Sequence, residues 1–129
     1  MIDHISLAVR DLRESEPFYT ALLAPLGMTK LREWPNAAVG YGKKYPEFWI
    51  NRRTGMNRIA ADSGVHICLR AGDAGAVDAF HAAALNAGGA SDGAPGLRPE
   101  YHGKYYAAFI RDPDGNRIEA VTFLSETAE

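Results

Sequence analysis

The most informative stretch of the chain reads Asp112-Pro113-Asp114-Gly115-Asn116-Arg117-Ile118-Glu119-Ala120-Val121. Proline fixes φ at the second position of a turn and glycine accepts a positive φ, so the first four residues predict a tight β-turn. The apolar residues that follow predict a short strand. This strand carries one carboxylate, Glu119, which alone would be interpreted as a solvated residue, because glutamate is rarely buried without a partner.

Outside this stretch, the chain contains an internal repeat with an offset of 62 residues. Seven residues recur at that offset, in the pairs His4 and His66, Ile5 and Ile67, Leu7 and Leu69, Asp11 and Asp73, Phe18 and Phe80, Leu23 and Leu85, and Gly27 and Gly89. Each half begins with a strand in which apolar and polar residues alternate, at residues 3–9 and 65–70. The repeat indicates a duplicated structural unit.

Capping residues and periodicity predict the other elements of the first half. Asp11 can begin to cap a helix whose regular part is expected to start nearer Ser15, and Gly27 ends it. Three short strands are expected near residues 29–33, 37–41 and 47–51. The first half is therefore predicted to have the order βαβββ.

The second half follows the same order in part. Asp73 caps a helix with a buried stripe that includes Phe80 and Leu85. The segment 91–104 is rich in Gly and Pro, so we expect a surface loop with a brief strand at residues 97–99. Strands at 105–110 and 117–123 then form a hairpin.

These elements predict an α+β fold of two tandem βαβββ modules, at residues 1–58 and 61–123. The modules are expected to form a curved mixed sheet with the helices outside. Together they make a single domain over residues 1–124, followed by a tail at 125–129.

Length and composition limit the classes of function. A chain of 129 residues, 47% of them hydrophobic, is long enough to bury the core of one domain. A net charge of −2 gives no reason to expect nucleic acid or an anionic membrane as a partner. No apolar run approaches the roughly 18 residues of a membrane span, and the start lacks a signal-peptide pattern, so we expect a cytoplasmic protein. The single cysteine, Cys68, excludes an internal disulfide.

His4 and His66 occupy the same place in the two repeated strands, opposite the apolar face. If the modules pack side by side, both imidazoles point into the concave side of the sheet, where Glu119 could join them. Two imidazoles and a carboxylate in a partly open cleft can bind a divalent metal and leave positions for water or substrate. The alternative interpretation of each histidine alone is a polar residue at the start of a strand.

Together these motifs resemble the vicinal oxygen chelate superfamily, which includes lactoylglutathione lyase (glyoxalase I), bleomycin-resistance proteins and extradiol dioxygenases. The resemblance covers nearly the whole chain. It rests on His4-Ile5-Ser6-Leu7, Asp11-Leu12 with Phe18-Tyr19, Gly64-Val65-His66-Ile67, and Asp112-Pro113-Asp114-Gly115-Asn116 with Ile118-Glu119. Zinc, nickel, iron and manganese all suit the predicted ligands, a small molecule is the expected substrate, and a homodimer is a further expectation.

The lyase of this superfamily has four metal ligands, His, Glu, His and Glu, which lie on the first and last strands of its two modules. The resemblance implies ligands at the matching positions of this chain. His4, His66 and Glu119 match three of them. In the closest register, Trp49 stands where the lyase has its other glutamate, and Glu47 lies two residues away on the same strand face. The missing carboxylate takes part in proton transfer in the lyase.

The catalytic base is therefore left open among Glu119, a metal-bound hydroxide, Glu47, Tyr105 and His102. The residues predicted to contact substrate are Trp49, Tyr101, Phe109 and Arg98. Tyrosines that pack a loop against the sheet would explain the aromatic cluster equally well. The resemblance also places Phe109 where extradiol dioxygenases have a tyrosine.

The sequence thus predicts a divalent-metal-dependent lyase or isomerase of the glyoxalase type that acts on a small substrate with vicinal oxygens. One alternative is a non-catalytic small-molecule binding protein of the same fold, similar to the antibiotic-sequestering proteins. An extradiol-type dioxygenase is the other alternative.

Overall fold

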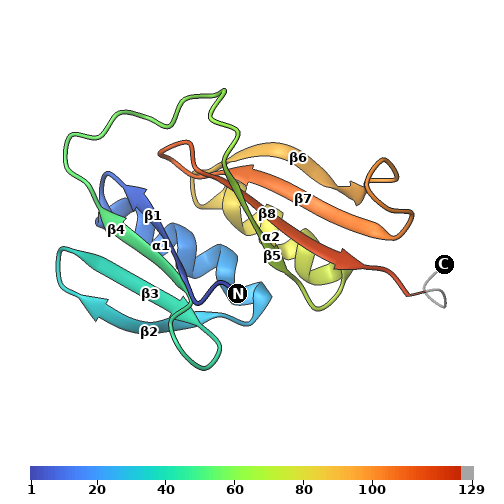
Figure 1. The fold of residues 1–129 in the computed structure, drawn as a ribbon, viewed down its shortest axis with the longest axis horizontal. Coiled ribbons are helices and arrows are strands. Elements are labelled where there is room, and N and C mark those ends of the chain that lie inside the picture. The colour runs from blue at the N-terminus through green and yellow to red at the C-terminus, as the bar shows by residue number, and fades with distance from the viewer. Residues whose placement is uncertain (126–129) are drawn as a thin grey trace.

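The structure is a computed structural model that describes residues 1–125, so only Ser125 of the expected tail lies within it. The first half contains β1 (Ile5–Val9), α1 (Leu12–Leu23), the 3₁₀ helix η1 (Ala24–Leu26), β2 (Thr29–Trp34), β3 (Ala38–Gly42) and β4 (Phe48–Arg52). The second half contains β5 (His66–Arg70), α2 (Ala74–Asn86), β6 (Ala90–Leu97), β7 (Tyr105–Arg111) and β8 (Arg117–Phe123). The two halves lie side by side and are linked by the segment 53–65 (Figure 1).

Each half forms a four-stranded mixed sheet, with the orders β1-β4-β3-β2 and β5-β8-β7-β6. In both sheets the first strand runs parallel to the last, and the other neighbours are antiparallel. This topology confirms the prediction of two βαβββ modules. Within residues 1–125 the two sheets stay separate, and β1 and β5 do not pair with each other.

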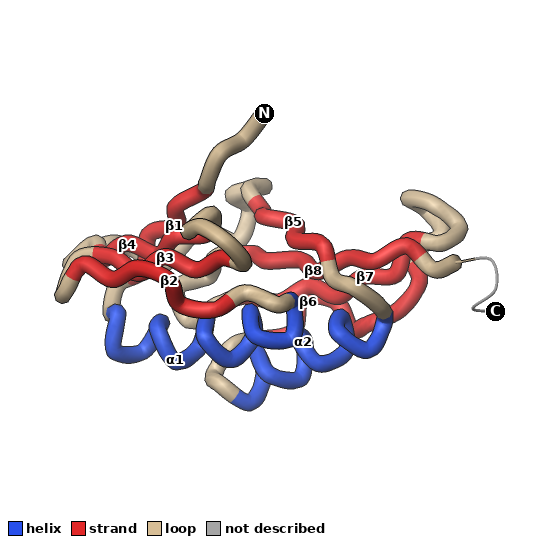
Figure 2. The backbone as a smooth tube through the Cα atoms, turned by 90° about the horizontal axis from the view of Figure 1, so that it is seen from below, coloured by secondary structure: helices blue, strands red, loops and turns tan. Residues whose placement is uncertain are grey.

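Both helices cover the same side of the sheets, and the other side is open (Figure 2). Alternation along the strands explains the two sides, because Leu7 of β1 and Leu69 of β5 pack against the helical core. Phe18 of α1 and Phe80 of α2 are fully buried in one cluster to which both modules contribute. None of the helices in residues 1–125 is long and apolar enough to span a membrane.

The predicted turn forms at Asp112 and is buried. The N–H of Gly115 donates to the carbonyl of Asp112 at 2.9 Å, and Gly115 adopts a φ of 91°. Asp112 Oδ1 accepts the N–H groups of Asp114 at 2.9 Å and Asn116 at 2.8 Å. The aspartate side chain therefore satisfies the backbone donors of its own turn.

The same turn fastens the second module to the first. Three hydrogen bonds make the link: the Tyr19 hydroxyl donates to Asp112 Oδ2 (2.5 Å), Asn116 Nδ2 donates to the Ala8 carbonyl (3.0 Å), and the Arg10 N–H donates to Asp114 Oδ2 (3.2 Å). Two of these bonds satisfy backbone groups at the end of β1. We call this set of contacts the module clasp.

Three expectations about the elements are wrong. The segment expected to begin a surface loop forms β6, whose register shifts between Ser91 and Gly93 and again before Gly96. Irregular pairing accommodates Gly and Pro within a strand, so their presence concealed it. Helix α1 begins at Leu12, with Pro17 inside it. Leu85 is 43% exposed and does not belong to the buried stripe.

Candidate functional site

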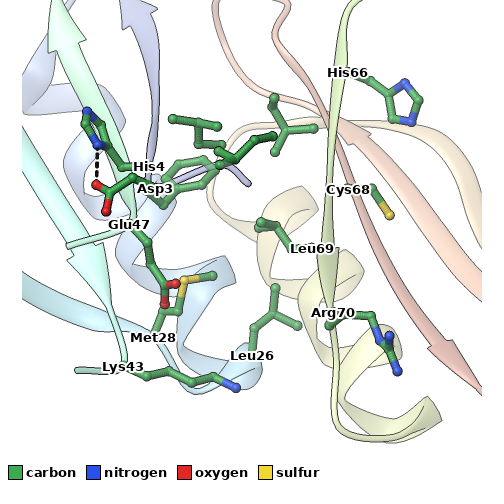
Figure 3. A pocket seen from close by; sticks show the side chains of 14 residues that line it. Asp3, His4, Leu26, Met28, Lys43, Glu47, His66, Cys68, Leu69 and Arg70 are labelled. Atoms are coloured by element: carbon green, nitrogen blue, oxygen red, sulfur yellow. Dashed lines mark hydrogen bonds and ion pairs between the residues drawn. The ribbon is translucent and has the colours of Figure 1, made fainter. Parts of the chain in front are cut away.

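The open side of the molecule has two sheet faces and a groove between them (Figure 3). The groove has a volume of about 550 Å³, and its walls include His4 and Glu47 from the first module and His66 and Leu69 from the second. His4 and His66 lie on opposite sides of it, with their rings directed away from each other. The two histidines therefore face separate parts of the open side.

The open face of the second sheet contains a buried carboxylate. Glu119 is only 2% exposed. Its Oε1 lies 3.0 Å from His66 Nε2, and its Oε2 accepts a hydrogen bond of 2.5 Å from the Tyr105 hydroxyl. Because a buried carboxylate is unfavourable unless it is hydrogen-bonded, these two partners stabilise Glu119 in place.

The strand register explains how these side chains meet. Phe109 of β7 is the direct partner of Glu119, and Tyr105 lies farther along β7 on the same face. Ala107 lies between them and is small and fully buried, so the tyrosine can lean across it to the carboxylate. His66 comes from β5, the parallel neighbour of β8.

Burial and the carboxylate change the acidity of the groups around Glu119. Desolvation and the hydrogen bond to Glu119 raise the pKa of Tyr105 well above its ordinary value, so the hydroxyl stays protonated at neutral pH. Desolvation and the charge of Glu119 raise the pKa of the Cys68 thiol to about 11. Its Sγ lies 3.9 Å from the Tyr105 hydroxyl. Neither group is an anion at neutral pH.

Aromatic side chains form a rim beside the carboxylate. The rings of Tyr101 and Phe123 meet the Tyr105 ring edge-on, at centroid distances of 5.1 and 5.4 Å. His102 packs against Phe123 at 5.8 Å, and its Nδ1 accepts the N–H of Lys104. His102 therefore belongs to the rim, and within residues 1–125 it makes no hydrogen bond to Glu119.

Arg98 and Phe109 form the other side of this face. The guanidinium carbon of Arg98 lies 5.3 Å from the centre of the Phe109 ring. Arg98 also donates to the carbonyls of Gly96 at 2.8 Å and Ala94 at 2.7 Å. Much of its donor capacity is therefore used to hold the end of β6, which leaves less for a substrate.

The predicted metal ligands come together only in part. His66 and Glu119 are adjacent, but His4 Nδ1 is hydrogen-bonded to Asp3 Oδ2 at 2.7 Å on the other side of the groove. Within residues 1–125, no three His, Cys, Asp or Glu side chains are grouped closely enough to hold a metal ion. The donor set of one chain therefore does not fit a three-ligand metal site.

The first module carries Trp49 in the place of Glu119. Trp49 pairs with Ser6 as Glu119 pairs with Cys68, and Ser6 and Cys68 are equivalent in the repeat. Glu47 precedes β4 and lines the groove. No hydrogen bond or ring contact within residues 1–125 joins Trp49 or Glu47 to the Glu119 cluster.

The sequence reasoning missed two aromatic residues. Alternation along β8 places Phe123 on the same face as Glu119 and could have revealed it. Trp34 faces Trp49 at a ring distance of 5.5 Å on the first sheet. No pattern indicated Trp34, because every residue of β2 is exposed and the strand lacks a buried periodicity.

Comparisons with known proteins identify the family to which this fold and site belong. The family model described as the Glyoxalase/Bleomycin resistance protein/Dioxygenase superfamily matches residues 1–120. A glyoxalase/bleomycin resistance protein from Albidiferax ferrireducens T118 has 33% sequence identity and a TM-score of 0.81, and the match covers 94% of this chain and 98% of that one.

A second solved structure is similar in fold alone. The fosfomycin resistance protein FosX from Listeria monocytogenes, solved with Mn(II) and 1S,2S-dihydroxypropylphosphonic acid, has 15% identity and a TM-score of 0.70. The match covers 99% of this chain and 94% of that one. No curated protein matches the sequence.

Proposed function

Because this chain belongs to the glyoxalase/bleomycin resistance protein/dioxygenase superfamily, we propose that it is a lyase or isomerase that moves a proton within a small substrate with vicinal oxygens. The observation that carries this proposal is the buried Glu119 carboxylate, which Tyr105 and His66 hold on an open sheet face. A positioned carboxylate in a partly desolvated site is a suitable general base for removing a proton next to a carbonyl.

In the proposed reaction, Glu119 takes a proton from a carbon that bears a hydroxyl and neighbours a carbonyl. The electron pair of the broken C–H bond moves toward the carbonyl oxygen and gives an enediolate. The proton of the substrate hydroxyl passes to the other oxygen, and return of the abstracted proton to the neighbouring carbon completes an isomerisation. Tyr105 keeps its hydrogen bond to Oε2, and the substrate proton is received at Oε1, beside His66 Nε2.

His66 is suited to contact the same intermediate. Its side chain is 48% exposed, and its Nε2 lies beside the carboxylate oxygen that would receive the proton. Once Oε1 has taken the substrate proton, it no longer accepts from His66, and the imidazole N–H can donate to the oxyanion that has formed. His66 is therefore proposed as the oxyanion donor.

The divalent metal and the homodimer stay predictions for this protein. His66 and Glu119 are suitable ligands, but His4 is not grouped with them in one chain, so the proton transfer is assigned to side chains alone. Sedimentation equilibrium measures the oligomeric state directly.

Hydrogen exchange from solvent tests the proposed proton transfer. The protein would be mixed in D₂O with α-hydroxy carbonyl compounds and with the methylglyoxal–glutathione hemithioacetal, and deuterium uptake at carbon followed by NMR. We expect Glu119→Gln to lower the exchange rate by about 100-fold or more. Glu47→Gln, which neutralises the other candidate carboxylate, should exchange deuterium at the wild-type rate. Equal exchange by wild type and Glu119→Gln would contradict the proposal.

A binding protein is the second candidate. The observation that favours it is the aromatic rim, in which Tyr101 is 61% exposed and available for contact with an apolar ligand. Saturable binding of these compounds without exchange or turnover would support this candidate. The dioxygenase alternative has less support, because Phe109 has no hydroxyl; cleavage of a catechol under oxygen would favour it.

A further inference from the structure

The open face of the first sheet carries a second arrangement of side chains, which the proposed reaction does not use. A hollow of about 570 Å³ lies on this face, within the range of pockets that hold one small molecule. Its lining includes Trp34 and Trp49 together with Arg32 and Arg53.

Small residues of β3, an inner strand of this sheet, lie beneath the two tryptophans. Gly40 of β3 lies directly between Arg32 of β2 and Trp49 of β4, and Ala38 lies beside Trp34. A Cβ added to Gly40 would approach Pro46 Cβ to 2.8 Å and Trp49 Cε2 to 2.9 Å, so both side chains pack directly on this glycine. The two indoles can therefore meet above β3, with centroids 5.5 Å apart and planes tilted by 43°.

This tryptophan pair is unusual because it faces solvent. Trp34 is 58% exposed, although a large aromatic side chain is normally buried for most of its area. The pair presents a broad apolar surface that can stack with another ring, since aromatic rings favour offset or edge contacts at such separations. The geometry favours a planar ligand over a branched one.

The charges around the hollow favour an anion. Neither the Arg32 nor the Arg53 guanidinium has a hydrogen bond or an ion pair with another side chain within residues 1–125. The carboxylate of Asp3, which also lines the hollow, is engaged by His4 Nδ1 at 2.7 Å. Two unpaired guanidinium groups beside an aromatic surface are suited to a carboxylate attached to a ring.

We propose that the open face of the first module is a binding site for a planar aromatic carboxylate. The ligand ring stacks on Trp34 and Trp49, and its carboxylate pairs with Arg32 and Arg53. This inference goes beyond the proposed reaction, because it does not involve Glu119.

Tryptophan fluorescence tests this site directly, since Trp34 and Trp49 are the two tryptophans of the chain. The probe is 4-nitrobenzoate, whose nitroaromatic ring quenches indole emission on contact. We expect saturable quenching, with at least about tenfold weaker binding of the neutral 4-nitrobenzamide, as expected for the loss of a charged hydrogen-bond partner. Cyclohexanecarboxylate, which has the charge without the aromatic ring, should compete poorly.

Matched variants locate the site. Arg32→Gln and Arg53→Gln should each weaken 4-nitrobenzoate binding severalfold and leave 4-nitrobenzamide unchanged, whereas Arg13→Gln on α1 should leave both unchanged. Trp34→Ala should weaken both probes in calorimetry, and Glu119→Gln should bind as wild type does. The proposal would be overturned by linear quenching without saturation, or by equal affinity for 4-nitrobenzoate and 4-nitrobenzamide. It would also be overturned if Arg13→Gln and Arg32→Gln had equal effects, or if Trp34→Ala bound the probes as wild type does.

Discussion

The Cys68 thiol provides a residue-scale test of the environment of Glu119. Its raised pKa of about 11 means that the thiolate, the reactive form, becomes abundant only at high pH. We expect the rate of alkylation by iodoacetamide in EDTA-treated protein to rise about tenfold per pH unit from pH 7 to 10 without a plateau. In urea the rate for the same cysteine should reach half its maximum near pH 8.5, the ordinary pKa of a thiol, and level off about one pH unit above it. A plateau below pH 9 in the folded protein would contradict this environment.

The ligand set of the predicted metal can also be tested one residue at a time. His66 and Glu119 are adjacent, whereas His4 is held by Asp3 across the groove. In calorimetric titrations with Zn²⁺ or Mn²⁺, we therefore expect His66→Ala and Glu119→Gln to lower affinity at least tenfold and His4→Ala to have little effect. An equally large loss in His4→Ala would mean that a rearrangement or a second copy brings His4 to the pair.

At the scale of elements, the module clasp is expected to contribute measurably to stability. Tyr19→Phe removes the hydroxyl that donates to the buried Asp112 carboxylate, at a cost of about 1–3 kcal/mol in the free energy of unfolding. Tyr106→Phe is the matched control, because its hydroxyl bonds Asp78 at the surface, and we expect a change within about 0.5 kcal/mol. Urea denaturation measures both. Similar losses in the two variants would argue against a special role for the clasp.

The sequence predicted correctly those elements that depend on neighbouring residues in the chain. The turn at Asp112 and the strands β1 and β5 follow from residue types and from alternation. Strand β6 escaped prediction, because Gly93, Pro95 and Gly96 are typical of loops, and only pairing with β7 makes the segment a strand. The proximity of His66 and Glu119 could be predicted from the expected placement of their strands on one sheet. The reach of Tyr105 and the separation of His4 depend on how side chains and sheets pack, which no local pattern encodes.

At the scale of the whole molecule, the shared core predicts cooperative unfolding. Buried residues of both modules form one cluster, so neither module can lose its packing without exposing apolar surface of the other. Both tryptophans lie in the first module and Cys68 lies in the second, which gives each module its own probe. We expect tryptophan fluorescence, Cys68 accessibility and circular dichroism to report the same midpoint in urea. A midpoint for Cys68 well below that of the tryptophans would indicate independent modules.

Because the module clasp and the shared core both join the modules, we expect the two halves to dock even when the chain that links them is cut. The linking segment 53–65 is exposed over most of its length, and nothing lies within 4 Å of a Cβ built at Gly55 or Gly64. Two peptides divided within this segment would each carry one partner of the clasp and one part of the core. Such fragments are suited to reassembly as a split protein, in which fusion partners that meet would restore the fold.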